Sequence, residues 1–155
     1  MKKLAILIVL FACSACEEEL DPPEITGAIR ALWVGARSVE DDSRSFDLQL
    51  NNMGEEVLII ESIKMRGDQN CAFEIKGPDT TELGENDAAF IRGWYHPESI
   101  AVDQIVIEIT SNADNMPLFI VPICGQGIAP EDDPKSYEPM TCNIPPPDQP
   151  DCTEI

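Results

Sequence analysis

The chain has 155 residues, enough for one ordinary domain with accessory segments, which excludes a large multidomain enzyme. Hydrophobic residues make up 43% of the chain, so wholesale disorder is excluded as well. With 29 acidic residues against ten Lys and Arg, the formal net charge is -19. Such a charge repels phosphate backbones and excludes nucleic acid as a partner. Six cysteines in so short a chain indicate an oxidising compartment.

The first 12 residues predict an export signal. Residues 1–3 form a short positively charged start, and the apolar run of residues 4–12 is too short to span a bilayer. The run ends in Leu10–Cys13, which resembles the lipobox of bacterial lipoproteins. This resemblance implies that Cys13 becomes the first residue of the mature chain and that its acyl chains anchor the protein to a lipid membrane.

Cys16 is the alternative acceptor for the lipid, because small residues also precede it. The position three before Cys16 is a cysteine where a lipobox has leucine, so Cys13 is favoured. Resemblance to enterobacterial lipoproteins implies a location in the bacterial cell envelope. The outer membrane is favoured over the inner one, since Ser14 is not an evident retention signal. Residues 13–24 are then an acidic, proline-stiffened tether.

Residues 25–127 predict a succession of strands, because apolar residues recur mostly at every second position. Turn residues separate seven such segments, and the third of them is expected to bend near Glu61 and Ser62. The segments are Leu32–Val34, Phe46–Leu50, Val57–Met65, Cys71–Ile75, Ala89–Trp94, Ile105–Ile109 and Phe119–Ile123. About seven short strands in about 100 residues predict an all-β, Ig-like antiparallel β-sandwich.

Short motifs in this region resemble those of ASH/Hydin-type domains, which are called choice-of-anchor D repeats in bacterial surface proteins. Each motif is short, but their order and spacing match over roughly 75 residues. The motifs are Asn52–Gly54 with Val57–Ile60, Arg66–Gly67 with Phe73–Ile75, Leu83–Glu85, Tyr95–Pro97, Ile107–Asn112 and Val121–Pro130. The resemblance implies a non-catalytic scaffold that docks other macromolecules.

Four cysteines follow the tether and allow three pairings. Cys71 is expected to open one strand and Cys124 to close the last, whereas Cys142 and Cys152 share the tail. The predicted disulfides are therefore Cys71–Cys124 and Cys142–Cys152. The spacing of these cysteines does not match a metal site. Residues 128–155 hold seven of the 13 prolines and are expected to lie extended or irregularly along the sandwich.

Neither a catalytic site nor a cofactor site is predicted. His96 is the only histidine and is read as a turn residue beside Pro97. Trp33 and Trp94 are interpreted as core or corner anchors, although an exposed pair on one face would favour a carbohydrate platform. The acidic loops at 41–42 and 114–115 lack the spacing of a calcium-binding loop.

Two hypotheses about function remain. The favoured one is a membrane-anchored lipoprotein whose sandwich binds another envelope or surface protein, which predicts exposed edge strands or an apolar patch and no deep polar pocket. The alternative is a periplasmic lipoprotein that binds calcium or a small cationic ligand.

Overall fold

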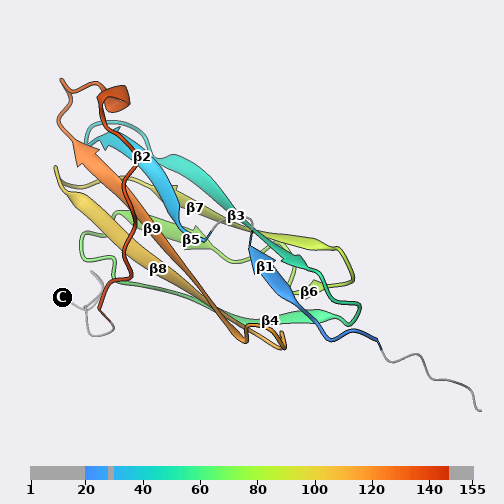
Figure 1. The fold of residues 1–155 in the computed structure, drawn as a ribbon. Helices are drawn as coiled ribbons and strands as arrows, with labels where there is room; N and C mark the ends of the chain where they lie inside the picture. The colour runs from blue at the N-terminus through green and yellow to red at the C-terminus, as the bar shows by residue number, and fades with distance from the viewer. Residues whose placement is uncertain (1–19, 28–29, 147–155) are drawn as a thin grey trace, which may run out of the picture.

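The computed structural model describes residues 20–27 and 30–146, whose strands pack as two sheets (Figure 1). A 3-10 helix, η1 (Pro134–Ser136), follows the last strand. No helix among the described residues is long and apolar enough to cross a membrane. The strands are β1 (Ile25–Gly27), β2 (Leu32–Ser38), β3 (Arg44–Asn52), β4 (Leu58–Arg66), β5 (Phe73–Lys76), β6 (Glu82–Leu83), β7 (Ala88–Tyr95), β8 (Val102–Ser111) and β9 (Leu118–Ile128).

The four-stranded sheet has the order β1-β3-β7-β5, and the five-stranded sheet has the order β2-β9-β8-β4-β6. This arrangement confirms the predicted Ig-like sandwich. One pair departs from the antiparallel expectation: β2 runs parallel to β9, with Leu32 opposite Ile123 and Trp33 opposite Cys124. The chain thus changes sheet between β1 and β2, so that its first part contributes an edge strand to each sheet.

The core lies between the sheets and follows the predicted alternation. On β8, Ile105, Ile107 and Ile109 are fully buried in the core cluster, whereas Gln104 and Glu108 on the opposite face are only half-buried. The predicted bend in β4 is confirmed, because its register with β8 shifts between Ile60 and Ser62. Burial of alternate side chains supplies the main stabilisation of such a sandwich.

The predicted segment at Cys71 begins too early. The strand β5 starts at Phe73, because Cys71 adopts a left-handed backbone conformation, with φ of 52°, that interrupts an extended strand. The last strand, in contrast, continues beyond Cys124 to Ile128. Cys71 therefore does not open a strand, and Cys124 does not close one.

The described end of the chain crosses the outer face of the five-stranded sheet, and we call residues 137–146 the strap (Figure 1). Its Cys142 is bonded to Cys124 of β9 and also lies 3.2 Å from the backbone oxygen of Leu32. Val106 on this outer face is fully buried although it is not part of the core cluster. The strap adds a thin third layer to the sandwich.

Candidate functional site

The N-terminal segment enters the sandwich at one end, between two turns. The backbone oxygen of Asp21 accepts a hydrogen bond from the N–H of Glu56 (3.0 Å), and that of Pro23 accepts one from the N–H of Asp114 (2.9 Å). We call the end where residues 20–24 make these contacts the tether end. The backbone pairing fixes where the predicted tether leaves the domain.

Asn52 organises this end from a fully buried position. Its side-chain oxygen accepts hydrogen bonds from two backbone N–H groups, and its side-chain nitrogen contacts three backbone oxygens. The donors are Glu24 and Gly54, and the acceptors are Glu56, Leu83 and Gly84. Gly54 is needed because any Cβ there would collide with the backbone oxygen of Pro22. The Asn-x-Gly motif therefore holds the entering segment and the neighbouring turns of the tether end together.

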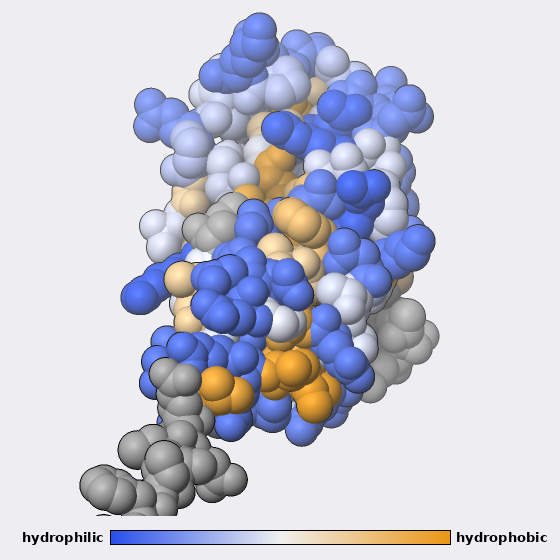
Figure 2. All heavy atoms as spheres, turned by 90° about the vertical axis from the view of Figure 1, so that its right-hand side faces the viewer, coloured by the Kyte–Doolittle hydropathy of each residue, from blue (hydrophilic) through white to orange (hydrophobic). Residues whose placement is uncertain are grey.

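An exposed apolar cluster lies at the same end, on the outer face of the five-stranded sheet. It consists of Val57, Ile59, Met116 and Leu118, whose exposed fractions range from 40% to 49%, and we call it the end patch. The side chain of Asn112, in the turn that leads to Met116 and Leu118, hydrogen-bonds the N–H of Ile59 and the backbone oxygen of Val57. Figure 2 shows apolar residues gathered at the lower end of this view, within hydrophilic surroundings.

Acidic side chains accompany the end patch along the chain. Glu55 and Glu56 precede Val57, and Asp114 lies two residues before Met116; all three acidic residues are exposed. The end patch is therefore an exposed apolar surface whose neighbours along the chain carry negative charge.

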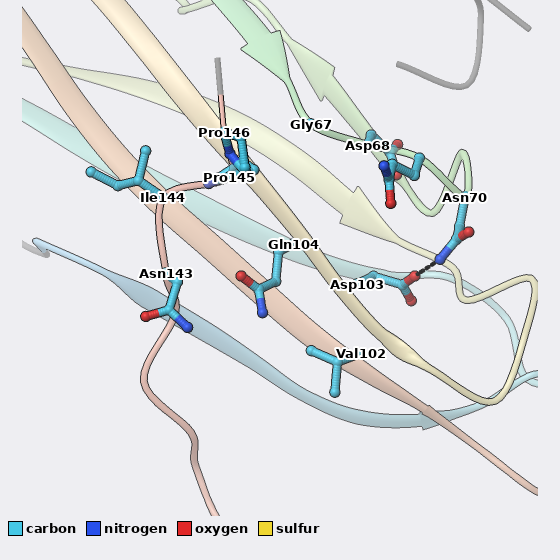
Figure 3. Close-up of a pocket in the computed structure, with 11 residues that line it drawn as sticks. Gly67, Asp68, Asn70, Val102, Asp103, Gln104, Asn143, Ile144, Pro145 and Pro146 are labelled. Atoms are coloured by element: carbon cyan, nitrogen blue, oxygen red, sulfur yellow. Dashed lines mark hydrogen bonds between the residues drawn. The ribbon is translucent and has the colours of Figure 1, made fainter. Parts of the chain in front are cut away.

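A polar hollow lies at the opposite end of β4 and β8 (Figure 3). It has a volume of about 300 Å³ and is lined by the loop after β4, the start of β8 and the strap. These linings comprise residues 67–70, 102–104 and 143–146. Since the strap forms one wall, the shape of the hollow depends on the path of the C-terminal segment.

The two buried carboxylates that line the hollow already accept hydrogen bonds from groups of the domain itself. Asp68 accepts hydrogen bonds from the N–H groups of Ala72 and Phe73, both at 2.9 Å. Asp103 accepts one from the side chain of Asn70 (2.6 Å) and one from the hydroxyl of Tyr95 (2.8 Å). Both carboxylates therefore tie the loop after β4 to the sandwich, and this use does not require a bound cation.

Burial raises the pKa of Asp103 above its ordinary value, and the hydrogen bonds from Asn70 and Tyr95 oppose this rise. The pKa of Tyr95 is also raised, first by burial and then by the charge of Asp103. The folded state thus holds the Asp103 proton more tightly than the unfolded chain does.

We expect the stability of the wild-type protein, relative to Asp103→Asn, to decrease as the pH rises from about 4, the ordinary value of an aspartate. Between the unfolded and folded pKa values the native state binds more protons, so raising the pH favours unfolding there. Urea denaturation of both proteins between pH 3.5 and 7 measures this difference. A difference that stays constant or increases with pH would contradict the assignment.

The residues singled out from the sequence lie apart from one another. His96 directly follows β7, in the predicted turn; its Nε2 lies 4.0 Å from Glu98, and its buried Nδ1 has no hydrogen-bond partner among the described residues. Trp33 and Trp94 are both half-buried and lie on the outer faces of different sheets, so they are neither core residues nor a pair.

The predicted disulfide pairing is wrong. Cys124 is bonded to Cys142 across 18 residues, and not to Cys71. The reason is side-chain direction: Ile123 points into the core, so Cys124 points to the outer face, where the strap passes. Cys71 is disulfide-bonded as well. Cys13, Cys16 and Cys152 lie outside the described residues.

Within residues 20–27 and 30–146, no three His, Cys, Asp or Glu side chains come together in a way that could hold a metal ion. The acidic loops noted in the sequence have structural contacts instead. Arg37 donates a hydrogen bond to the backbone oxygen of Asp42. The side chain of Asn115 bonds both the N–H and the oxygen of Ile25, and so caps the edge strand β1.

Neither the family models nor the curated proteins include a match to this chain. Solved structures do resemble it. A Porphyromonas gingivalis protein of unknown function has a TM-score of 0.58 at 18% identity, over 67% of this chain and 46% of that one. The ASH/PapD-like domain 7 of human CEP192 has a TM-score of 0.57 at 9% identity, over 84% and 99%. The Vibrio cholerae protease VesB has a TM-score of 0.54 at 9% identity, over 66% and 32%.

These likenesses concern the fold. The chain spans about half the length of the Porphyromonas protein and about a third of VesB, but nearly all of the human domain. Since all identities are below 20%, the residues of the end patch and of the hollow have no counterpart to be transferred from these proteins. The fold of this chain is an Ig-like sandwich of the ASH/PapD-like type.

Proposed function

We propose that this chain is a lipid-anchored protein of the bacterial envelope, in the outer membrane rather than the inner, whose sandwich is a non-catalytic module that docks another envelope protein. The observation that carries the proposal is the end patch, an exposed apolar surface on an otherwise strongly acidic domain. Exposed apolar clusters on soluble domains are typical of protein interaction sites.

The location of the end patch fits an anchored protein. Leu20 lies seven positions after Cys13, so an acylated Cys13 would hold the tether end within about 25 Å of the lipid surface. A partner docked there would lie close to the same membrane. The acidic residues beside the patch repel an anionic lipid surface and favour a basic protein surface.

The arrangement of polar residues supports a non-catalytic role. The hydrogen bonds of Asp68 and Asp103 hold backbone and side-chain groups of the domain itself. No hydroxyl or thiol group among the described residues is hydrogen-bonded to His96. A nucleophilic hydroxyl or thiol would need such a base beside it.

Two measurements test the proposal. Metabolic labelling with palmitate should label the wild type and Cys16→Ala but not Cys13→Ala; label retained on Cys13→Ala would contradict the predicted anchor. For docking, a photo-crosslinking amino acid is placed at Ile59, with Val102 as control, because both residues are apolar, similarly exposed and on the same sheet.

The crosslinker at Ile59 should yield a discrete protein adduct that Asn112→Ala weakens, since Asn112 positions the backbone of the patch. The crosslinker at Val102 should yield no such adduct. Equal adducts at both sites, or none at Ile59, would contradict docking through the end patch.

A further inference from the structure

The outer face of the four-stranded sheet carries an aromatic row along β7 that neither the end patch nor the hollow uses. Phe90, Arg92 and Trp94 alternate with buried residues and point away from the core. Phe90 is 43% exposed, and Trp94 is half-buried. The row is therefore accessible on the surface of a sheet whose backbone is held by neighbours on both sides of β7.

Trp94 stands between two hollows. One has a volume of about 310 Å³ and is lined by Asp47, Lys76, Phe90 and Arg92, among others. The other has a volume of about 430 Å³; its lining includes Ser43, Phe73, Glu74 and His96. Both include Trp94 itself, so the indole can contact a ligand that occupies either side.

Polar groups of both signs surround the aromatic row. Arg92 donates a hydrogen bond to Asp47 at 2.8 Å, and the two residues are opposite each other in the register of β3 and β7. Glu74 and Lys76 lie on β5, opposite Trp94 and Arg92. Among the described residues, the side chains of Glu74 and Lys76 have neither a hydrogen bond nor an ion pair. The Glu74 carboxylate can therefore accept a hydrogen bond from a ligand beside the indole, and the Lys76 ammonium can donate one.

We propose that this face binds a neutral oligosaccharide. The C–H faces of sugar rings pack on aromatic side chains, and their hydroxyls both donate and accept hydrogen bonds, as Asp47, Glu74, Lys76 and Arg92 require. A charged ligand would meet side chains of its own sign on this face. Phe90 and Trp94 are four residues apart on one strand, about 13 Å, which fits a chain of sugars rather than a single ring.

This site is independent of the proposed docking function, because it lies on the other sheet from the end patch. It is tested with the full chain, purified in a zwitterionic detergent that contains no sugar. The probes are the neutral hexasaccharides of the cellulose, chitin and maltose series, a heparin-derived hexasaccharide and glucose. Binding is measured by isothermal titration calorimetry.

At least one neutral hexasaccharide should bind, and glucose should bind more than tenfold more weakly. Trp94→Ala should weaken that binding at least tenfold, whereas Trp33→Ala, which removes the half-buried tryptophan of the other sheet, should leave it within twofold. Arg92→Ala is the second variant: its exposed ion pair contributes little to folding, and it should also weaken binding several-fold.

Thermal unfolding of each variant shows whether the fold is retained. The proposal is overturned if none of the neutral hexasaccharides binds at millimolar concentration. It is also overturned if heparin hexasaccharide alone binds, or if Trp94→Ala and Arg92→Ala both retain binding. Loss of binding in Trp33→Ala together with Trp94→Ala, with the fold intact, would equally contradict it.

Discussion

Replacing Asn52 with alanine should lower the free energy of unfolding by about 3–5 kcal/mol, because it would leave several backbone groups without their partner at once. The Asn52 amide connects the entering segment at Glu24, the turn at Gly54 and the turn after β6 at Gly84. It is fully buried, so water cannot replace it at little cost. Urea denaturation followed by tryptophan fluorescence measures the loss.

Asn51→Ala is the matched control. Asn51 is an adjacent asparagine on the same strand, but it is half-buried, and its side chain accepts one hydrogen bond from Gln49. We expect a loss of about 1 kcal/mol or less from Asn51→Ala. Similar losses for the two variants, or a loss below about 1 kcal/mol for Asn52→Ala, would show that the buried amide does not hold the tether end together.

Alternation predicted the strands well because each strand buries one face, and the pattern that reports this burial is local in sequence. Ile105, Ile107 and Ile109 are the clearest example, since all three lie in the core. The short strands β1 and β6, of three and two residues, were missed because no periodicity can be read from so few residues. They depend on their neighbours, as Leu83 does on Leu58 in β4.

Pairing between distant segments was not predictable in the same way. The parallel contact between β2 and β9 and the path of the strap are determined by which surfaces remain uncovered once the sheets have formed. One signal was nevertheless present. Val121 and Ile123 face the core, so alternation alone directs Cys124 outward and away from a partner inside the sandwich.

The end patch and the polar hollow also depend on contacts between segments that are distant in the sequence. In the run Val57–Ile60 all four residues are apolar, so alternation alone does not decide which two face the core. The structure buries Leu58 and Ile60 and leaves Val57 and Ile59 exposed. That Met116 and Leu118 join them requires the turn at Asn112 to lie beside β4. The polar hollow requires the strap as one of its walls and was not anticipated.

The motifs that carry the resemblance to ASH-type domains contain residues that stabilise the fold. Asn52 and Gly54 hold the tether end together, and Tyr95 packs on Gly125, where an added Cβ on residue 125 would lie 2.5 Å from the tyrosine ring. Such residues explain why the fold could be anticipated from short motifs. They also explain why the motifs do not identify a partner, because the exposed surfaces are made by other residues.

Removing the disulfide between Cys124 and Cys142 should lower the free energy of unfolding by about 3 kcal/mol, the value that loop entropy gives for the 18-residue separation of the two cysteines. The double variant Cys124→Ala/Cys142→Ala should also expose Val106, which is buried on the outer face that the strap crosses, so hydrogen exchange should accelerate in the central part of β8.

Asn143→Ala is the control for the disulfide variant. Asn143 is an exposed strap residue beside Cys142, and we expect its replacement to change stability by less than about 0.5 kcal/mol. Peptide mapping of the unreduced wild type should recover Cys124 linked to Cys142. If the double variant is as stable as the control and exchange in β8 is unchanged, then the strap is held by its packing on the sheet and the covalent bond is dispensable for the third layer.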